Sequence, residues 1–341
     1  MKNSNEIYIV AEIGHNHRGS IEEAKSLFKA AKTAGANAVK LQKRDNKSLY
    51  TRAFYNQIYD NPNSYGETYG KHREALEFNF NQYKELQEYA KSIEIDFFAT
   101  PFDPESVDFL EKLNMQAYKI ASADLTNSPL QEKIAKLSKP IFLSTGGGTL
   151  EDIKRAAELI LKYNKNLTIL HCTASYPAKL EDMNLSVIKT LKREFPELRI
   201  GLSDHENGID AGVIAYMLGA RVFEKHFTLS HANKGTDHAF SLEPRGLTNF
   251  VRNIKRVDIM MGSETKKLLE SEKKPLFKMK KSIVAKTNLK ANHIIQFKDL
   301  AFKSPGGGLD PYRYKEIIGK KLNSDIKEED IILLDNLKND Q

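Results

Sequence analysis

The sequence predicts an α/β protein, a (β/α)8 barrel followed by a small domain of mainly β character. Short apolar runs alternate with segments of helical period over residues 6–262. There are eight such runs, the number that closes a barrel of parallel strands. After residue 262 the alternation stops, and the rest of the chain has the pattern of short strands and turns.

The expected strands are apolar where they begin and polar where they end. They cover residues 8–14, 38–43, 96–102, 117–122, 140–146, 167–174, 199–205 and 222–229. Amphipathic helices are expected between them, among others over residues 20–35, 81–93, 149–164 and 208–220, and several begin at a Ser, Thr or Asn cap. The connection over residues 44–80 is longer than an ordinary loop and rich in Tyr, Asn and charge, so we expect it either to carry function or to be disordered.

The domain boundaries follow from these patterns. We expect a barrel domain over residues 1–262, a Lys/Glu/Pro-bearing linker over 263–280 and a small domain over 281–341. In this linker region, acidic residues interleave with the lysines and aromatic stacking residues are scarce. The net charge of +7 therefore indicates a solvated linker face rather than a nucleic-acid site.

The cellular compartment is suggested by the cysteine content and the apolar runs. Cys172 is the single cysteine of 341 residues, which excludes an internal disulfide framework and a Cys-rich zinc site and is typical of a reducing compartment. We expect it to be a small buried side chain. The apolar runs are shorter than the roughly 20 residues that a membrane span requires, and the first residues lack the features of a signal peptide. The sequence therefore predicts a cytoplasmic protein without a membrane partner.

Polar or titratable residues fall near the ends of all eight expected strands. They are Glu12, Lys40, Thr100, Lys119, Ser144, Thr173, His205 and His226. In a barrel of this type the carboxyl ends of the strands converge on one face, where active sites are built. The pattern therefore predicts a functional face there.

Two histidines stand at the ends of adjacent strands, His205 in GLSDH and His226 in EKHFT. Neutral imidazoles on neighbouring strands suit a divalent transition metal such as Mn²⁺, with positions left for substrate and water. The first strand adjoins the eighth in a closed barrel, so Glu12 can supply a carboxylate to the same place. Asp237, in the loop after His226, can supply another. Any single histidine, taken alone, is more often a structural residue.

Two lysines, Lys40 and Lys119, end the second and fourth strands. Hydroxyl groups and a Gly-rich turn are expected nearby, namely Thr100, Ser144, Ser203 and residues 146–148. Ammonium groups, hydroxyls and backbone N–H groups together would hold a phosphate and a carboxylate. Two alternatives remain open: Lys119 forms a Schiff base, as in an aldolase barrel, or both lysines simply reach solvent at the strand ends.

The order of short motifs resembles a known family. The motifs are AEIGHNHRGS (11–20), VKLQK (39–43), ATPFD (99–103), YKIASAD (118–124), STG (144–146), CTASYP (172–177), GLSDH (201–205), EKHFT (224–228) and GTDHAFSLEP (235–244). In this order they resemble the sialic acid synthase family of nonulosonate synthases, and the tail resembles the antifreeze-like (SAF) domain of that family.

The resemblance implies a metal-dependent transferase that condenses phosphoenolpyruvate with the open-chain aldehyde of an N-acetylated hexosamine. The products would be phosphate and a nine-carbon 2-keto acid. The implied acceptor is N-acetylmannosamine or its 6-phosphate, and the alternative acceptors lead to nonulosonates of the legionaminate, pseudaminate or Kdn type. The implied metal is Mn²⁺, with Mg²⁺ or Co²⁺ as alternatives. Two alternative functions lie outside this class of enzyme, namely a Schiff-base aldolase that uses Lys119 and a non-catalytic carbohydrate-binding barrel.

The resemblance also implies roles for individual residues. His205 and His226 resemble the metal ligands, and Glu12 and Asp237 resemble the carboxylates beside the sugar and the metal. Asp124 stands where the family often has Glu and is the implied water-activating base. The implied substrate-binding residues are Lys40, Gln42, Thr100, Lys119, Ser122, Ser144, Tyr176 and Ser203.

Two further segments bear on whether the acceptor sugar is phosphorylated and on how two subunits assemble. Residues 65–90 are similar to the animal members, which act on a 6-phosphorylated sugar, so Lys71, His72 and Arg73 would bind a phosphate or, alternatively, form an exposed basic loop. Ser304 stands where bacterial members carry an Arg that the small domain sends into a partner's active site. The resemblance implies a domain-swapped homodimer.

Overall fold

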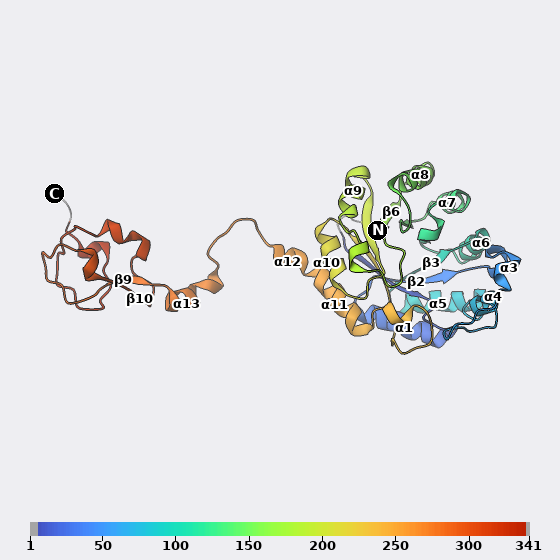
Figure 1. Ribbon diagram of the computed structural model, residues 1–341, viewed down its shortest axis with the longest axis horizontal. Coiled ribbons are helices and arrows are strands. Elements are labelled where there is room, and N and C mark those ends of the chain that lie inside the picture. The colour runs from blue at the N-terminus through green and yellow to red at the C-terminus, as the bar shows by residue number, and fades with distance from the viewer. Residues whose placement is uncertain (1–5, 339–341) are drawn as a thin grey trace. The chain divides into compact units, whose positions relative to one another are not determined.

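Eight parallel strands form a closed barrel in the order β1 to β8, with helices around it (Figure 1). The computed structural model describes residues 6–338 and divides into two units, Met1–Met261 and Gly262–Gln341, each with its own hydrophobic core. The predicted fold class is confirmed.

The barrel strands lie where the apolar runs predict them. They are β1 (Tyr8–Gly14), β2 (Ala38–Lys43), β3 (Asp96–Pro101), β4 (Tyr118–Ile120), β5 (Ile141–Ser144), β6 (Leu167–Cys172), β7 (Arg199–Asp204) and β8 (Val222–His226). Pairing of β1 with β8 closes the barrel and sets Glu12 opposite His226. Several strands end up to three residues earlier than predicted, because the last predicted residues, such as Phe102, Gly146 and Leu229, already belong to the loops.

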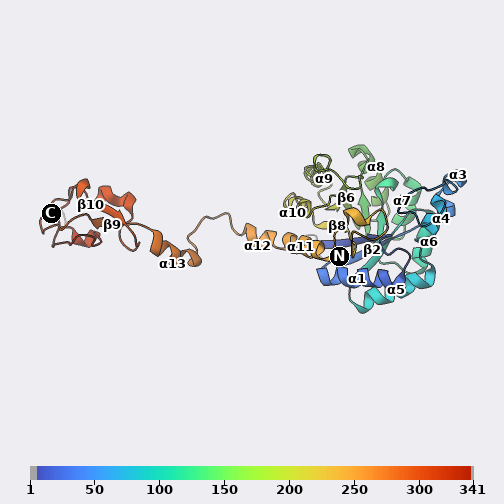
Figure 2. The same cartoon turned by 60° about the horizontal axis from the view of Figure 1, so that its bottom comes forward.

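Helices cover the outside of the barrel. They are α1 (Ile21–Ala34), α5 (Phe80–Ser92), α6 (Pro104–Lys112), α7 (Ser128–Ala135), α8 (Leu150–Leu161), α9 (Val187–Glu194), α10 (Asp210–Met217), α11 (Pro244–Lys255) and α12 (Val257–Met261). Helix α1 begins at Ser20, whose side chain accepts from the Glu23 N–H, and ends at Gly35 in the left-handed conformation. Helices α1 and α5 lie side by side against the barrel (Figures 1 and 2).

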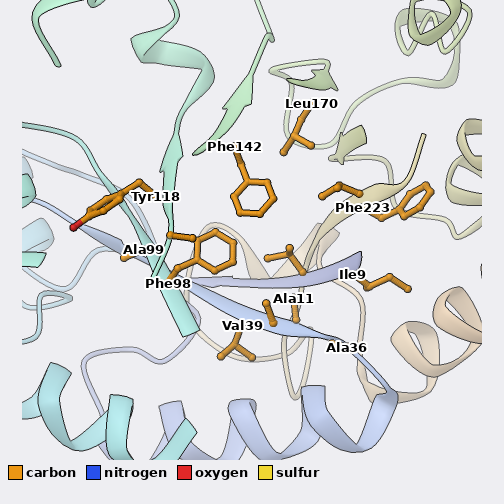
Figure 3. Packing of buried hydrophobic residues seen from close by; sticks show 14 of the residues in the cluster. Ile9, Ala11, Ala36, Val39, Phe98, Ala99, Tyr118, Phe142, Leu170 and Phe223 are labelled. Carbon is orange, nitrogen blue, oxygen red and sulfur yellow. The ribbon is translucent and has the colours of Figure 1, made fainter. Parts of the chain in front are cut away.

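Aromatic side chains fill part of the barrel interior. The rings of Phe98 and Phe142 stack with centroids 5.1 Å apart (Figure 3). The ring of Tyr8 stacks on that of Phe142 with centroids 6.1 Å apart. Phe98 and Phe142 each stand two residues before a polar strand-end residue, Thr100 and Ser144, and so share their face of the sheet. An apolar layer therefore lies beneath the polar ends of the strands.

The long connection between β2 and α5 is folded. It contains α2 (Asn46–Leu49), α3 (Arg52–Tyr55) and α4 (Tyr69–Glu74). The ring of Tyr69 packs against Phe54, Tyr50 and Tyr59, with centroids 4.6, 5.2 and 5.3 Å away. These aromatic contacts give the connection a small core of its own, so of the two expectations the one of a disordered segment is not met.

The second unit carries α13 (Glu270–Met279) and an antiparallel pair, β9 (Ser282–Ala285) with β10 (Leu300–Lys303). Isolated bridges extend the β character, and Ile283, Ile295 and Ile317 are fully buried in its core. Helix α13 falls inside the predicted linker, and none of its residues is buried. Within residues 6–338, no helix is long and apolar enough to cross a membrane.

Candidate active site

A cavity of about 790 Å³ opens at the carboxyl ends of the barrel strands. Thr173 does not line it, but all except one of the residues to which the resemblance assigns a catalytic, metal-binding or substrate-binding role do. They are Glu12, Lys40, Gln42, Thr100, Lys119, Ser122, Ser144, Tyr176, Ser203, His205, His226 and Asp237. The convergence arises because each residue sits at or just beyond a strand end on the same side of the barrel.

Asp124 is the residue that the structure does not bring to the cavity wall. It closes the short 3-10 turn Ser122–Asp124 after β4, and its Oδ1 accepts a hydrogen bond of 2.8 Å from Asn127. Burial raises the pKa of its carboxyl group. Ser122, Ala123 and Leu125 line the cavity instead, because successive side chains of the tight turn point in different directions.

Two lysines and two carboxylates form a buried charge cluster on the cavity wall. The Nζ of Lys40 lies 2.7 Å from Oε2 of Glu12 and donates to Oγ1 of Thr100 at 2.8 Å. Glu224 joins the two lysines, because its Oε1 lies 3.3 Å from Lys119 Nζ and its Oε2 lies 3.7 Å from Lys40 Nζ. None of the four charged residues is more than 4% exposed. The ion pairs therefore offset much of the cost of desolvating their charges.

Glu224 was missed by the sequence analysis, which took only His226 from its strand. Burial opposes its ionisation, but Lys119 and Lys40 hold its pKa down at about 2. Burial lowers the pKa of Lys119, and the charge of Lys40 adds to this while Glu224 opposes it. Strand alternation was the available signal, since Glu224 stands two residues before His226 and shares its face.

The two predicted metal ligands face each other at the cavity. The ring centroids of His205 and His226 lie 5.3 Å apart, with Tyr176 4.1 Å from the first ring and Phe240 4.8 Å from the second. Nδ1 of His205 lies 2.8 Å from the carbonyl oxygen of Thr173, to which it donates in the neutral ring. Burial and the neighbouring His226 lower the pKa of His205 to about 3, so its ring is uncharged at neutral pH.

The chemistry of this pair fits a divalent metal ion. The bond from His205 Nδ1 to a carbonyl leaves Nε2 as a lone-pair donor, the usual arrangement of a ligating histidine. Nδ1 of His226 is buried without a hydrogen-bond partner and lies 3.7 Å from Oδ2 of Asp237. In the described part of the chain, no three His, Cys, Asp or Glu side chains are grouped closely enough to hold an ion unaided. Substrate or water would have to complete the coordination.

The basic residues of the long connection divide into two groups. Arg73 lines the cavity, whereas Lys71 is exposed outside it. His72 is buried, and its Nδ1 accepts from the Tyr65 N–H at 3.0 Å. His15 and Arg44 also line the cavity and were missed by the sequence analysis, although they directly follow β1 and β2 and the strand-end pattern could have indicated them.

Comparison with known proteins finds related chains over nearly the full length. The model of the NeuB family matches residues 27–266, and that of the SAF domain matches residues 280–338. The N-acetylneuraminate-9-phosphate synthase of Mus musculus is 39% identical over 327 residues, which cover 96% of this chain and 91% of the relative. The N,N'-diacetyllegionaminic acid synthase of Campylobacter jejuni is 39% identical over 328 residues, which cover 95% and 98% of the two chains.

A solved structure supports the same relationship. The crystal structure of N-acetylneuraminic acid synthetase from Leptospira borgpetersenii, in complex with citrate, superposes with a TM-score of 0.69. That protein is 31% identical to this chain, and the match covers 80% of this chain and 91% of the other.

The buried charge cluster yields a stability prediction. Glu224→Gln keeps the size of the side chain but removes the carboxylate between the lysines, so we expect the free energy of unfolding at pH 7 to fall by about 3–5 kcal/mol. The folded state favours ionisation of Glu224. The contribution of its carboxylate to the free energy of unfolding is therefore complete above about pH 4.3, the pKa of a glutamate in the unfolded chain, and declines as the pH falls toward 2.

Denaturant unfolding of both proteins at several pH values measures this difference. Glu132→Gln is the control, because Glu132 forms its ion pair with Lys136 at the surface and should have little effect. Equal stability of Glu224→Gln and the unsubstituted protein at pH 7 would contradict the role given to the charge cluster.

Proposed function

Because this chain belongs to the NeuB family, we propose that it condenses phosphoenolpyruvate with the open-chain aldehyde of an N-acetylated hexosamine. The products are inorganic phosphate and a nine-carbon 2-keto acid. The observation that carries this proposal is that one cavity holds both a lysine cluster suited to anions and a pair of neutral imidazoles. The preferred acceptor is N-acetylmannosamine or its 6-phosphate. The Campylobacter relative supports a legionaminate-type acceptor as the alternative.

We assign phosphoenolpyruvate to the lysine side of the cavity. Lys40 and Lys119 offer N–H donors to its phosphate and carboxylate, and the hydroxyls of Thr100 and Ser144 are available as further donors. The hydroxyl of Ser203 donates to Oε1 of Glu224 at 3.0 Å and so holds that carboxylate in place. The two lysines are already paired with Glu12 and Glu224, which holds their ammonium groups in place before substrate binds. In this arrangement the substrate meets a fixed set of donors.

The reaction joins C3 of phosphoenolpyruvate to the aldehyde carbon of the sugar. The electron pair of the enol double bond forms the new C–C bond, and the aldehyde oxygen gains a proton. Water adds to C2 and loses a proton, and the resulting tetrahedral adduct expels phosphate to leave the 2-keto group. Glu12 and Asp237 face the cavity and are assigned to these proton transfers, whereas Asp124 receives no step because it does not line the cavity.

His205 and His226 would hold the divalent ion, Mn²⁺ in preference to Mg²⁺ or Co²⁺. A bound ion would supply Lewis-acid polarisation of the aldehyde oxygen. The protein's own contribution is to keep His205 neutral, to fix its tautomer through Thr173, and to shield both rings with Tyr176 and Phe240.

Removal of either imidazole should abolish condensation. His205→Ala and His226→Ala each delete one of the two proposed protein ligands, so we expect phosphate release to fall by at least about 100-fold while the circular dichroism spectrum stays unchanged. A chelator should inhibit the unsubstituted enzyme, and added metal should restore it. His231→Ala is the matched control, because His231 is exposed outside the cavity. Full turnover by a metal-free double variant would reject the metal role.

Loss of the Lys119 ammonium group should affect one substrate more than the other. For Lys119→Met we expect the KM for phosphoenolpyruvate to rise by about 100-fold, with a much smaller change for the sugar. Lys139→Met, which removes an ammonium group paired with Glu111 outside the cavity, is the control. If only sugar use suffers, the two substrates have been assigned to the wrong sides. Covalent trapping of Lys119 by borohydride in the presence of a carbonyl substrate would instead establish a Schiff-base aldolase.

We further propose that the enzyme is a homodimer in which each small domain closes the partner's barrel. Deletion of residues 281–341 should then leave a folded barrel with poor activity, because the site would no longer exclude water. Mixing the truncated chain with a full-length His226→Ala chain tests this. Hybrid dimers would join an intact barrel to a complete small domain and recover phosphate release. Confirmed hybrid dimers without recovery would show that closure does not act between subunits.

A further inference from the structure

A fully buried ion pair joins β7 to β8 outside the cavity. Nζ of Lys225 lies 2.7 Å from Oδ2 of Asp204, and each of the two side chains is only 1% exposed. Neither residue lines the cavity. The reaction steps proposed above therefore give neither charge a role.

The ion pair lies directly behind the two predicted metal ligands. Asp204 stands opposite Lys225 in the ladder between β7 and β8. His205 and His226 are the next residues along the two chain segments, and both line the cavity. Because successive side chains of a strand point to opposite faces, the ion pair faces away from the cavity. A shift of one strand end relative to the other at the ion pair would therefore move the two imidazoles apart.

The ion pair also holds the chain on both sides of His205. Oδ1 of Asp204 accepts from the Glu206 N–H at 2.9 Å, and Nζ of Lys225 donates to the carbonyl oxygen of Glu206. The residues before and after His205 are thus both bound to Lys225. We refer to Asp204, Lys225 and the backbone of Glu206 as the strand-end clamp.

Other backbone hydrogen bonds hold each histidine separately. The carbonyl oxygen of His205 accepts from the Ala178 N–H at 3.0 Å, and that of His226 accepts from the Leu242 N–H at 2.8 Å. These two bonds attach the histidines to different loops. The strand-end clamp, by contrast, connects the two chain segments that carry them.

The burial of two charges at this place has a use other than stability. Removing an ammonium group and a carboxylate from water is costly, and apolar side chains of similar volume would pack here without that cost. The ion pair adds direction instead, because Lys225 donates to two defined oxygens and Asp204 accepts from two defined donors. An apolar pair would not fix the two strand ends in this way.

The imidazole pair needs such a constraint because it offers an ion few protein ligands. The ring centroids of His205 and His226 lie 5.3 Å apart. With only two proposed ligands from the protein, a displacement of one ring takes it out of reach of an ion that the other ring binds. Contacts that orient the ligands therefore contribute directly to affinity for the ion.

We propose that the strand-end clamp is a positioning device for the imidazole pair, which fixes the separation and orientation of His205 and His226 and thereby sets the affinity of the site for a divalent ion. This inference rests on the proposed function, which assigns the ion to these two rings. Asp204 and Lys225 are positioning residues in this scheme, because they act through the histidines and do not line the cavity.

The test measures binding of Mn²⁺ to a variant that lacks both charges. Asp204→Asn combined with Lys225→Met keeps the two side chains close to their size and leaves no unpaired charge in the interior. We expect the dissociation constant of Mn²⁺ to rise by about 10–100-fold. It is determined without substrates from the signal of the free ion in electron paramagnetic resonance, and thermal unfolding establishes that the variant folds.

Glu77→Gln combined with Lys43→Met is the matched control, because it removes another internal ion pair. Nζ of Lys43 lies 2.7 Å from Oε2 of Glu77, and both side chains are 11% exposed. Lys43 ends β2, which pairs with β1 and β3 and not with the strands of the imidazole pair. This control should bind Mn²⁺ as the unsubstituted protein does. An equal loss of affinity in the control would show that the effect is not specific to the clamp and would overturn the inference.

A second measurement follows the ring of His205 in the absence of any ion. Its Nδ1 lies 2.8 Å from the carbonyl oxygen of Thr173, so the ring proton on Nδ1 is protected from water. Nuclear magnetic resonance of protein with ¹⁵N-labelled histidine gives the exchange rate of this proton, and His205→Gln identifies its signal. We expect exchange at least about tenfold faster in the clamp variant, because the chain on both sides of His205 loses its attachment.

The outcomes separate this inference from the proposed function. Unchanged Mn²⁺ affinity in a folded clamp variant would overturn the positioning role while the condensing activity stands. If the double variant does not fold, Asp204→Asn alone takes its place in both measurements, because it keeps Lys225 and its bond to the Glu206 carbonyl oxygen. If the unsubstituted protein binds neither Mn²⁺, Mg²⁺ nor Co²⁺, the metal role in the proposed function fails. The exchange rate then decides the positioning of His205, and an unchanged rate rejects it.

Discussion

The charge cluster of Lys40, Lys119, Glu12 and Glu224 is the constraint on which the rest of the cavity depends. Two buried ammonium groups are tolerated at this depth because two carboxylates lie between 2.7 and 3.7 Å from them. The aromatic layer beneath confines these charges to one end of the barrel, where solvent can enter. Since two positive and two negative charges cancel, the lysines offer phosphoenolpyruvate N–H donors in fixed positions, and net positive charge has to come from other residues of the cavity.

Two groups of residues in the cavity can supply this positive charge. The imidazole pair has the chemistry to hold a divalent ion, and Arg44 and Arg73, which meet at the ring of His15, form no ion pair with a carboxylate of residues 6–338. Asp237 lies near both, 3.7 Å from His226 and close enough to act electrostatically on Arg73. The positive charges of Arg44 and Arg73 thus lie in the same cavity as the imidazole pair.

The sequence predicted the barrel and most of the cavity wall because both depend on local pattern. Buried parallel strands appear as apolar runs, and their polar last residues converge once the barrel closes. Glu224 could have been predicted by the same reasoning, because it stands two residues before His226 in β8. The exclusion of Asp124 from the cavity wall could not be predicted in this way, because the direction of its side chain depends on the tight turn after β4. His15 and Arg44 directly follow β1 and β2, so the strand-end pattern could have placed them, but the contact of His15 with Arg73 depends on how the connection folds.

The two ends of the cavity are built from different parts of the fold. Lys40, Lys119 and Glu224 belong to barrel strands, whereas Arg44 and Arg73 belong to the connection that the ring contacts of Tyr69 hold together. Strands are constrained by the whole barrel, but a connection of this kind can change without disturbing it. Relatives with equal identity to this chain are named for different products, a phosphorylated neuraminate and a legionaminate. Overall identity therefore does not determine the acceptor, and the residues of this connection are where selectivity for the acceptor can change.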